Sequence, residues 1–302
     1  MTTSSYAIAV GNDAYLLHPE LLELVPFGSS LTAKLLQNRI GETLVDDPAT
    51  DSNITVVVRV FNEASALEKL FEDIDKQVYS GAIEVVVVDN GSSDRSPAIA
   101  KDYGAEVVTL DQSKFTYPRS LNLGMAAASN DLVFVTVAHV RLSSTHSLHA
   151  GARHFTINKS TAGAFGTCFP NDGASYFERW GAATKPNLFL GRPAGRVEKA
   201  GLGVLGATGA MIAKSAWQEL GGFDERYQAG GEDTALAKLM LENGYGVVRE
   251  PALTVHHSHG LDLADSFKQY VHQLQIVRGP RQFDRLGLLS RRPDLRANRS
   301  AS

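Results

Sequence analysis

The sequence has little of what marks disulfide-rich, cysteine-ligated or membrane-spanning proteins. It contains 1 cysteine in 302 residues, Cys168, which excludes an intramolecular disulfide and a cysteine-cluster metal site and fits a reducing compartment. The longest mainly apolar runs, such as 83–88, fall far short of the roughly 20 residues of a membrane span. The first residues, MTTSSYAIAV, lack the basic start and long apolar stretch of a signal peptide. We therefore expect a cytoplasmic protein.

An excess of positive charge is also missing. The chain has 29 Lys and Arg against 33 Asp and Glu, a net charge of −4, which argues against a general nucleic-acid binder. The segment 279–302 is basic and has little apolar periodicity; it holds Arg281, Arg285, Arg291, Arg292, Arg296 and Arg299. We expect a disordered tail there. Contact with the inner face of a membrane is expected only through this tail, since basic segments gain about 1 kcal/mol per charge on anionic lipid.

Strands and helices alternate from Ile54 onward, which predicts an α/β fold. Segments rich in β-branched residues indicate strands, and apolar residues at helical spacing indicate helices. The predicted strands are 54–60, 83–88, 106–110 and 132–138, and the predicted helices lie around 67–74, after Pro97 and over 118–128. Repeated strand–helix–strand units imply a mostly parallel sheet with helices on both faces.

The second half of the chain is less regular. It predicts strands over 163–169 and 204–213, helices over 232–243 and 262–278, and a mobile loop over 185–195. Before the alternation, residues 1–52 form an N-terminal extension with a helix-like stretch around 30–40 and an acidic, turn-rich junction. We interpret the extension as a packing or dimerisation segment, and we expect a homodimer.

Polar residues follow the predicted strands. Three clusters follow the first, second and fourth strands: Phe61-Asn62-Glu63, the run Asp89–Asp94, and Ala138-His139. Each cluster alone is also consistent with a turn and a helix cap. In parallel sheets, however, ligands bind beyond the carboxyl ends of the strands, where the strand order reverses. The clusters therefore predict a ligand site at that edge of the sheet.

Taken together and in order, these segments resemble the inverting glycosyltransferases of family 2, which have the nucleotide-binding GT-A fold. The similarity covers about residues 54–260. Its matching segments are Val60–Glu63 for Tyr-Asn-Glu, Val88–Asp94 for Val-Asp-Asp-Gly-Ser-x-Asp, Arg119–Gly124 for the helix with Arg and Asn-x-Gly, Gly209–Glu225 for the acceptor-side segment, Gly231–Leu236 for Gly-Glu-Asp-x-Asp-Leu, and Val255–His259 for the late histidine segment. Ala235 departs from the fifth motif. The resemblance implies a Rossmann-like GT-A domain over 53–278, with a nucleotide-binding half, 53–140, and an acceptor half, 141–278.

The resemblance also implies roles for individual residues. It places the base and ribose of a nucleoside-diphosphate sugar, with UDP favoured, near Phe61, Asn62, Glu63, Asp89 and Asn90. Arg119 supplies charge-assisted hydrogen bonds to the diphosphate. Displacement at an anomeric carbon needs a base on the acceptor hydroxyl; we assign that role to Asp233, and we assign Glu232 to orienting the acceptor. The acceptor is expected to be a carbohydrate, a lipid or a small molecule.

One departure from the family concerns the metal. Most members end the fourth strand with Asp-x-Asp, whose second carboxylate binds Mg²⁺ or Mn²⁺, whereas residues 136–140 here read Thr-Val-Ala-His-Val. His139 aligns with the second aspartate, and a register error of one residue would substitute Ala138 as the nucleotide contact. Three explanations stay open: His139 binds a divalent metal with His257 or His259, it binds the phosphate without a metal, or activity has been lost.

Two other functions are alternatives to glycosyl transfer. A non-catalytic sugar-nucleotide-binding module would explain the missing Asp-x-Asp but has no need of the Glu232-Asp233 pair. A nucleotidyltransferase has a similar sheet, but it opens with a Gly-rich, Arg-containing loop after the first strand, and residues 59–63 form no such loop. We therefore expect an enzyme, a glycosyltransferase of the hexosyl-transferring type.

Overall fold

The structure is a computed structural model that describes residues 52–171, 174–175, 178, 195–201, 203–227 and 230–259. It also gives the backbone of two antiparallel strands, β1 (Tyr6–Val10) and β2 (Asp13–Leu17). Several predicted segments lie outside the described residues: the helices over 30–40 and 262–278, the basic tail over 279–302, and the loop over 185–195 except for Gly195, which lies in a strand.

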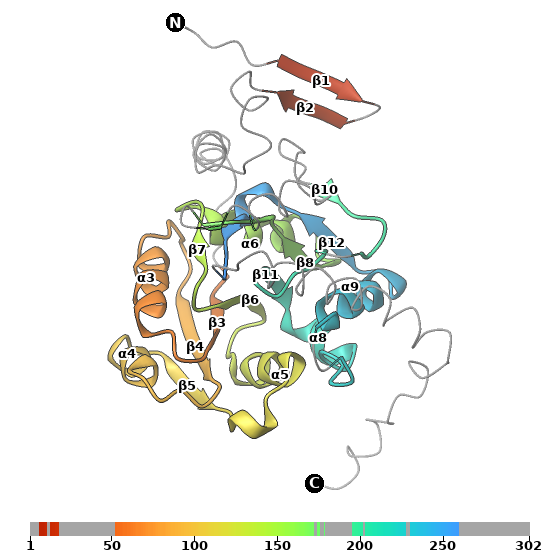
Figure 1. Cartoon of the computed structure of the whole chain (residues 1–302). Coiled ribbons are helices and arrows are strands. Elements are labelled where there is room, and N and C mark those ends of the chain that lie inside the picture. The colour runs from red at the N-terminus through yellow and green to blue at the C-terminus, as the bar shows by residue number, and fades with distance from the viewer. Residues whose placement is uncertain are drawn as a thin grey trace, which may run out of the picture.

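An eight-stranded mixed sheet forms the centre of the described part (Figure 1). Its first four strands along the chain run parallel: β3 (Ile54–Val60), β4 (Ile83–Asp89), β5 (Glu106–Thr109) and β6 (Leu132–Val137). These bounds confirm the four predicted strands, with differences only at their last residue. The strands lie in the order β6-β3-β4-β5, so the chain moves outward from β3 to β5 and then returns to the other side of β3.

Helices cover both faces of this sheet, as the alternation predicts. They are α3 (Ala64–Asp75), α4 (Ser96–Asp102) and α5 (Tyr117–Ala127), with a short 3₁₀ helix, η2 (Gln112–Lys114), before α5. In β3, Val56 and Val58 pack in one core cluster with Leu67 of α3, whereas Val57 packs in the other with Leu121 of α5. Because successive strand side chains point to opposite faces, a wholly buried strand contributes to both layers.

The other half of the sheet is partly antiparallel. Its strands and helices are α6 (Ser147–Ile157), β8 (Thr161–Phe165), β10 (Gly195–Arg196), β11 (Gly209–Ala213), α8 (Lys214–Glu219), α9 (Glu232–Glu242) and β12 (Gly246–Arg249). β11 pairs antiparallel with both β6 and β8, so one hydrogen-bonded sheet joins the two halves of the domain. The helix predicted over 232–243 is confirmed as α9.

For two strands in this half, the predicted residue ranges are wrong. The segment 163–169 is divided at Gly166 between β8 and β9 (Cys168–Phe169). The chain leaves the sheet there because the backbone of Leu253 lies against Gly166, where an added Cβ would be 2.1 Å from the Leu253 carbonyl carbon. The segment 204–213 is extended only over 209–213, since Leu205 has a left-handed φ of 62° that no strand accommodates.

A smaller sheet ties the end of the described chain to the segment after β6. Its strands are β7 (Arg141–Leu142), β13 (Val255–His256) and β9, with β13 in the middle, and a 3₁₀ helix, η3 (Pro251–Leu253), precedes β13. β13 is antiparallel to β7 and parallel to β9. This pairing brings His139, two residues before β7, next to His257, the residue after β13, although 118 positions separate them in the sequence.

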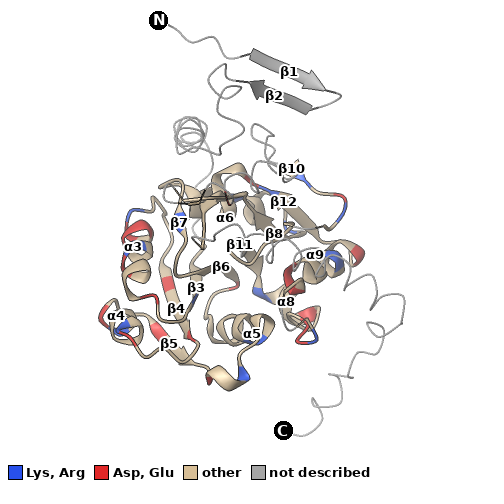
Figure 2. Ribbon diagram, in the orientation of Figure 1, with Lys and Arg blue, Asp and Glu red and all other residues tan. Residues whose placement is uncertain are grey.

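Charged residues lie mainly on the outer helices and the connecting loops (Figure 2). The central strands β3 and β6 carry a single charged residue, the buried Arg59. A buried charge needs compensating partners because its desolvation is costly. Among the described residues, no helix combines the length and the apolar character that crossing a bilayer requires.

Helix α5 packs closely against the sheet at Gly124. An added Cβ at this position would lie 2.3 Å from Val57 Cγ1 and 3.0 Å from Val88 Cγ2. In the same helix, Asn122 Oδ1 accepts a hydrogen bond from the Phe223 amide at 2.9 Å, and Asn122 Nδ2 donates to the Phe223 carbonyl at 2.8 Å. The Asn-x-Gly motif therefore joins α5 both to the sheet and to the acceptor-side segment.

We expect Gly124→Ala to lower the free energy of unfolding by about 1–3 kcal/mol, because the added methyl group overpacks the contact between α5 and β3. The measurement is urea denaturation at fixed pH. Gly201→Ala is the control, since an added Cβ there meets nothing within 4 Å. Equal stability of the two variants would show that α5 can move away from the sheet without cost.

Candidate functional site

The carboxyl ends of β3, β4 and β6 meet at one edge of the sheet. Val60 lies opposite Asp89 in the β3–β4 pair, and Arg59 lies opposite Val137 in the β3–β6 pair. The strand order reverses between β3 and β6, which is the position where parallel sheets bind ligands. The three polar clusters predicted to form a site therefore share this edge.

The loops after β3 and β4 are hydrogen-bonded to each other. Asn62 has a left-handed backbone, with φ of 53°, a conformation that asparagine adopts more readily than most residues. Its Oδ1 accepts from the amides of Ser93 at 2.8 Å and Asp94 at 3.3 Å, and its own amide donates to Ser92 Oγ at 2.9 Å. Asp94 Oδ2 accepts from the Ala64 amide at the start of α3, at 3.0 Å. These bonds fix the two loops relative to each other.

Asp89 and Asn90 are both buried at the end of β4. The Asp89 carboxylate accepts from the Ser92 amide, at 3.1 Å through Oδ1. Asn90 Nδ2 donates to the Val60 carbonyl at 3.1 Å, and its Oδ1 accepts from Ser120 Oγ at 2.9 Å. Asn90 thus links β4 to β3 and to α5. Contact of Asp89 and Asn90 with a nucleotide stays a prediction.

Phe61, Glu63, Ala138 and His139 have different environments at this edge. The Phe61 ring is 40% exposed, which leaves an aromatic face for stacking. Ala138 is fully buried, and its amide donates to the Arg59 carbonyl at 3.0 Å. The half-buried ring of His139 instead places Nδ1 2.5 Å from Glu63 Oε1. Of the two residues that the sequence register left open, His139 is the one whose side chain joins the polar cluster.

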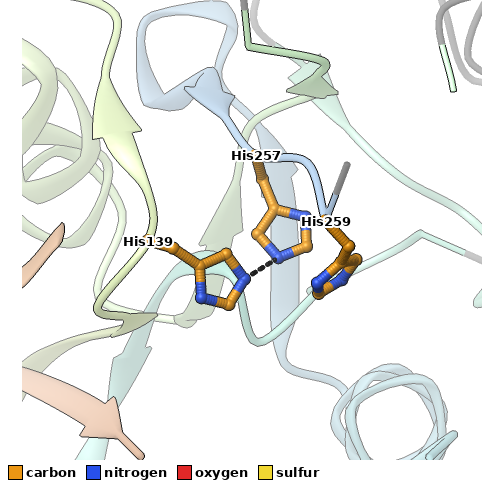
Figure 3. Close-up of side chains that lie close together, drawn as sticks. All are labelled: His139, His257 and His259. Carbon is orange, nitrogen blue, oxygen red and sulfur yellow. Dashed lines mark hydrogen bonds between the residues drawn. The ribbon is translucent and has the colours of Figure 1, made fainter. Parts of the chain in front are cut away.

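Three histidines converge beside Glu63 (Figure 3). His139 precedes β7, whereas His257 and His259 follow β13. The Nε2 atoms of His139 and His257 are 2.8 Å apart, and one ligand atom from each of the three rings lies within 4.8 Å of the others. The neighbouring His256 has its Nδ1 3.3 Å from the Pro170 carbonyl oxygen, outside this group. The structure thus brings together the three histidines predicted as metal ligands.

The chemistry of these three rings fits a divalent transition metal. Imidazole nitrogen suits Mn²⁺ and later transition metals, whereas Mg²⁺ prefers oxygen ligands. Partial burial and the neighbouring His139 lower the pKa of His259, which favours the neutral imidazole that a metal requires. Glu63 lies beside Nδ1 of His139, and Nε2 of the same ring faces His257. Carboxylate–histidine–metal sites have this arrangement.

Arg119 lies in the first turn of α5, where its amide donates to the capping Thr116 Oγ1 at 3.3 Å. Its guanidinium is partly exposed and pairs with Glu225, with Nη2 2.8 Å and Nε 3.1 Å from Oε2. Exposed ion pairs of this kind contribute at most about 1 kcal/mol. A diphosphate carries more charge than Glu225 and can displace it, so contact of Arg119 with the diphosphate stays a prediction.

The Glu232-Asp233 pair opens α9, after Gly231 with a left-handed φ of 99°. Asp233 is half-buried; its Oδ1 accepts from the Thr234 amide at 2.6 Å and its Oδ2 from the Ala207 amide at 3.3 Å. Burial raises the pKa of both carboxyl groups, and with the added effect of the Asp233 charge it raises the pKa of Glu232 to about 7. Carboxyl groups with raised pKa values suit general acid–base chemistry.

Arg59 also belongs to this site, although no motif in the sequence points to it. It is 7% exposed, and its guanidinium carbon lies 5.6 Å from the centre of the Tyr117 ring. Burial lowers the pKa of Arg59, and electrostatic interactions with Glu232, Tyr117, Asp233 and Glu63 oppose that shift. The sequence feature that could have identified Arg59 is its position as the single charged residue in the strand ITVVVRV. Every residue of this strand is buried.

A cavity of about 590 Å³ lies at the opposite edge of the sheet. It is lined by the starts of β4 and β5 and by the ends of α3 and α4, and it contains none of the predicted site residues. The candidate site is thus defined by converging side chains at the carboxyl ends of the strands, not by this cavity.

A model of a known protein family matches the larger part of the chain. The family model described as "Glycosyl transferase family 2" covers residues 55–220. The chain is 32% identical over 106 residues to a 4,4'-diaponeurosporenoate glycosyltransferase of Staphylococcus haemolyticus, covering 33% of this chain and 28% of that protein. It is 22% identical over 225 residues to the O-antigen chain rhamnosyltransferase RfbN of Salmonella typhimurium, covering 72% of this chain and 70% of that protein.

Solved structures share the fold. The mannosyltransferase PcManGT from Pyrobaculum calidifontis, solved in complex with GDP-Man and Mn²⁺, superposes with a TM-score of 0.52 at 18% identity, covering 75% of this chain and 64% of that one. Residues 1–349 of S. aureus TarS superpose with a TM-score of 0.54 at 14% identity, covering 74% and 65%. At these identities the likeness concerns the fold alone. It confirms the predicted α/β architecture of the GT-A type.

The raised pKa of Glu232 predicts a pH-dependent stability. Because the folded-state pKa of about 7 lies above the ordinary value of 4.5, the stabilisation from the protonated carboxyl is fully present below pH 4.5 and is lost as the pH rises through 7. Glu232→Gln carries a permanently neutral side chain. We therefore expect its free energy of unfolding to rise relative to wild type between about pH 5 and about pH 8, measured by urea denaturation.

The control for this measurement is Glu242→Gln, which removes an exposed carboxylate from the far end of the same helix. No comparable pH trend is expected for it. A difference between Glu232→Gln and wild type that stays constant with pH would contradict the burial of an ionisable Glu232.

Proposed function

The chain belongs to glycosyltransferase family 2, and from this membership we propose that it is an inverting transferase with Asp233 as its general base. The donor is a nucleoside-diphosphate sugar, and the acceptor is a hydroxyl group. The observation that carries the proposal is the Glu232-Asp233 pair at the start of α9, in which Glu232 is buried and Asp233 half-buried, with the pKa of Glu232 raised to about 7. Binding a sugar nucleotide without turning it over needs no such base.

The positions of the predicted nucleotide contacts support the same proposal. The Asn62 and Asp89 loops are hydrogen-bonded to each other at the edge where the strand order reverses between β3 and β6. Phe61 offers an exposed ring to the base, and Asp89 offers a carboxylate that can accept from a pyrimidine imide N–H. This acceptor favours a uridine nucleotide. PcManGT was solved with GDP-Man, so a guanosine donor is the alternative to test.

The proposed reaction is a direct displacement at the anomeric carbon. The Asp233 carboxylate takes the proton of the acceptor hydroxyl, and the hydroxyl oxygen forms a bond to the anomeric carbon. The bond from that carbon to the diphosphate oxygen breaks, and its electron pair leaves with the nucleoside diphosphate. Arg119 stabilises the charge that develops on the leaving group once it exchanges Glu225 for the phosphates. Glu232 orients the acceptor next to Asp233.

We further propose that His139, His257 and His259 hold a divalent cation. The support is the convergence of one nitrogen from each ring and the position of Glu63 on the far nitrogen of His139. A bound cation of this kind would neutralise charge on the diphosphate. The three imidazoles favour Mn²⁺ over Mg²⁺.

Asp233→Asn tests the assignment of the base. We expect kcat for donor hydrolysis and for sugar transfer to fall by at least about 100-fold, because the amide cannot accept the hydroxyl proton. The measurement is release of nucleoside diphosphate from UDP- and GDP-sugars, with nucleotide binding followed by calorimetry as a check on folding. Glu242→Gln on the same helix is the matched control.

If the wild-type protein binds the nucleotide but neither hydrolyses nor transfers any donor sugar, the chain is a binding module and not an enzyme. Undiminished turnover by Asp233→Asn would show that another group removes the proton.

His139→Ala tests the metal site. We expect EDTA to abolish wild-type turnover, Mn²⁺ to restore it, and His139→Ala to need a much higher Mn²⁺ concentration for half-maximal activity, since one of three ligands is lost. The matched control is His256→Ala, which removes the adjacent imidazole that faces Pro170. Turnover that resists EDTA in wild type, together with full activity of His139→Ala, would refute coordination by His139.

A further inference from the structure

A short loop connects the buried cation of β3 to the proposed base on α9. The carbonyl oxygen of Ala207 lies 3.5 Å from Arg59 Nη2, and the amide of the same residue donates to Asp233 Oδ2 at 3.3 Å. Ala207 is itself buried, and Leu205 is buried with a left-handed backbone in the same loop. One residue of the loop before β11 therefore contacts both the guanidinium and the carboxylate.

Arg59 faces a site with an excess of negative charge. The titratable groups around its guanidinium come from three elements: Tyr117 from α5, Glu63 from the loop after β3, and Glu232 and Asp233 from α9. Within the described residues, Nε of Arg59 and Oε2 of Glu232 have no hydrogen-bond partner. The Arg59 guanidinium thus lies near the carboxyl groups of Glu232 and Asp233, and no direct hydrogen bond joins them among the described residues.

We propose that Arg59 is a positioning residue for the general base, which holds Asp233 in place through the backbone of Ala207 and supplies a positive charge that favours the ionised form of the Glu232-Asp233 pair. The inference rests on the proposed function in one respect, the identity of Asp233 as the base. It assigns to β3 a part in proton transfer that is separate from its support of the nucleotide loops.

The physical need for such a cation follows from the burial of two adjacent carboxyl groups. In a site of low dielectric, two neighbouring carboxylates repel each other, and the pair retains a proton unless a positive charge compensates. An arginine serves this purpose because its guanidinium stays protonated even when buried. The charge of Arg59 opposes the upward pKa shifts of both Glu232 and Asp233. Without it, less of the pair is ionised at neutral pH, and less base is ready to accept the hydroxyl proton.

The test compares Arg59→Met with Arg59→Lys. Methionine fills a similar apolar volume, a kind of exchange that buried ion sites often tolerate, and lysine keeps the charge without the planar fork. The first readout needs no substrate: the free energy of unfolding is measured between about pH 5 and about pH 8. We expect Arg59→Met to lose more stability than wild type across this range, since its carboxyl groups hold their protons to higher pH, and Arg59→Lys to follow wild type.

The second readout is the pH profile of kcat on a UDP- or GDP-sugar that wild type hydrolyses. In Arg59→Met, the acid limb of the profile should lie at higher pH than in wild type, and kcat at about pH 6 should be at least about tenfold lower. The dissociation constant of the nucleoside diphosphate should stay within about twofold of the wild-type value. Arg59→Lys should restore the position of the limb. In an Asp233→Asn background, Arg59→Met should cause no further loss, because the group through which it acts is gone.

Arg95→Met, which removes an exposed arginine before α4, is the control for loss of a positive charge and should match wild type in both readouts. The inference is overturned if Arg59→Met keeps the wild-type stability slope and acid limb, or if Arg59→Lys is as impaired as Arg59→Met. Failure of the proposed function has a different signature, which is turnover retained by Asp233→Asn.

Discussion

The parallel pairing of β3 with β4 on one side and β6 on the other is the constraint on which the rest of this structure depends. It sets the ends of three strands at the same level, so that the residues following each of them meet without any long loop. The register places Val60 beside Asp89 and Arg59 beside Val137. The candidate contacts to the base and ribose lie within a few residues of these pairs, whereas Arg119, the candidate contact to the diphosphate, comes from α5.

The remaining groups reach this edge from the second half of the chain by two routes. The antiparallel strand β11 extends the main sheet, and the loop before it carries Ala207 to Asp233. The small sheet does the same for the histidines, since β13 pairs with β7, which begins two residues after His139. The acidic pair and the imidazole cluster are thus supported by different hydrogen-bonded networks, with Arg59 and Glu63 of the β3 segment between them.

The first half of the fold was predictable from the sequence because its strands are runs of β-branched residues separated by amphipathic helices. The second half was less so, since its strand ends depend on contacts between distant residues, such as Leu253 against Gly166. The grouping of His139 with His257 and His259 was predicted from a family resemblance, and the structure brings the three rings together. Arg59 was missed because periodicity identifies a buried strand but does not say which charges its one cation will face.

The hydrogen bonds of Asn62 to the loop that follows β4 have a consequence for ligand affinity. A binding surface made of two independent loops must lose conformational entropy when a ligand orders it, and that loss is subtracted from the interaction energy. Here the left-handed backbone of Asn62 and its bonds to Ser92, Ser93 and Asp94 impose that order in the free protein. The proposed nucleotide surface is thus preorganised, so binding there would require little rearrangement of these loops, even for small fragments of a nucleotide.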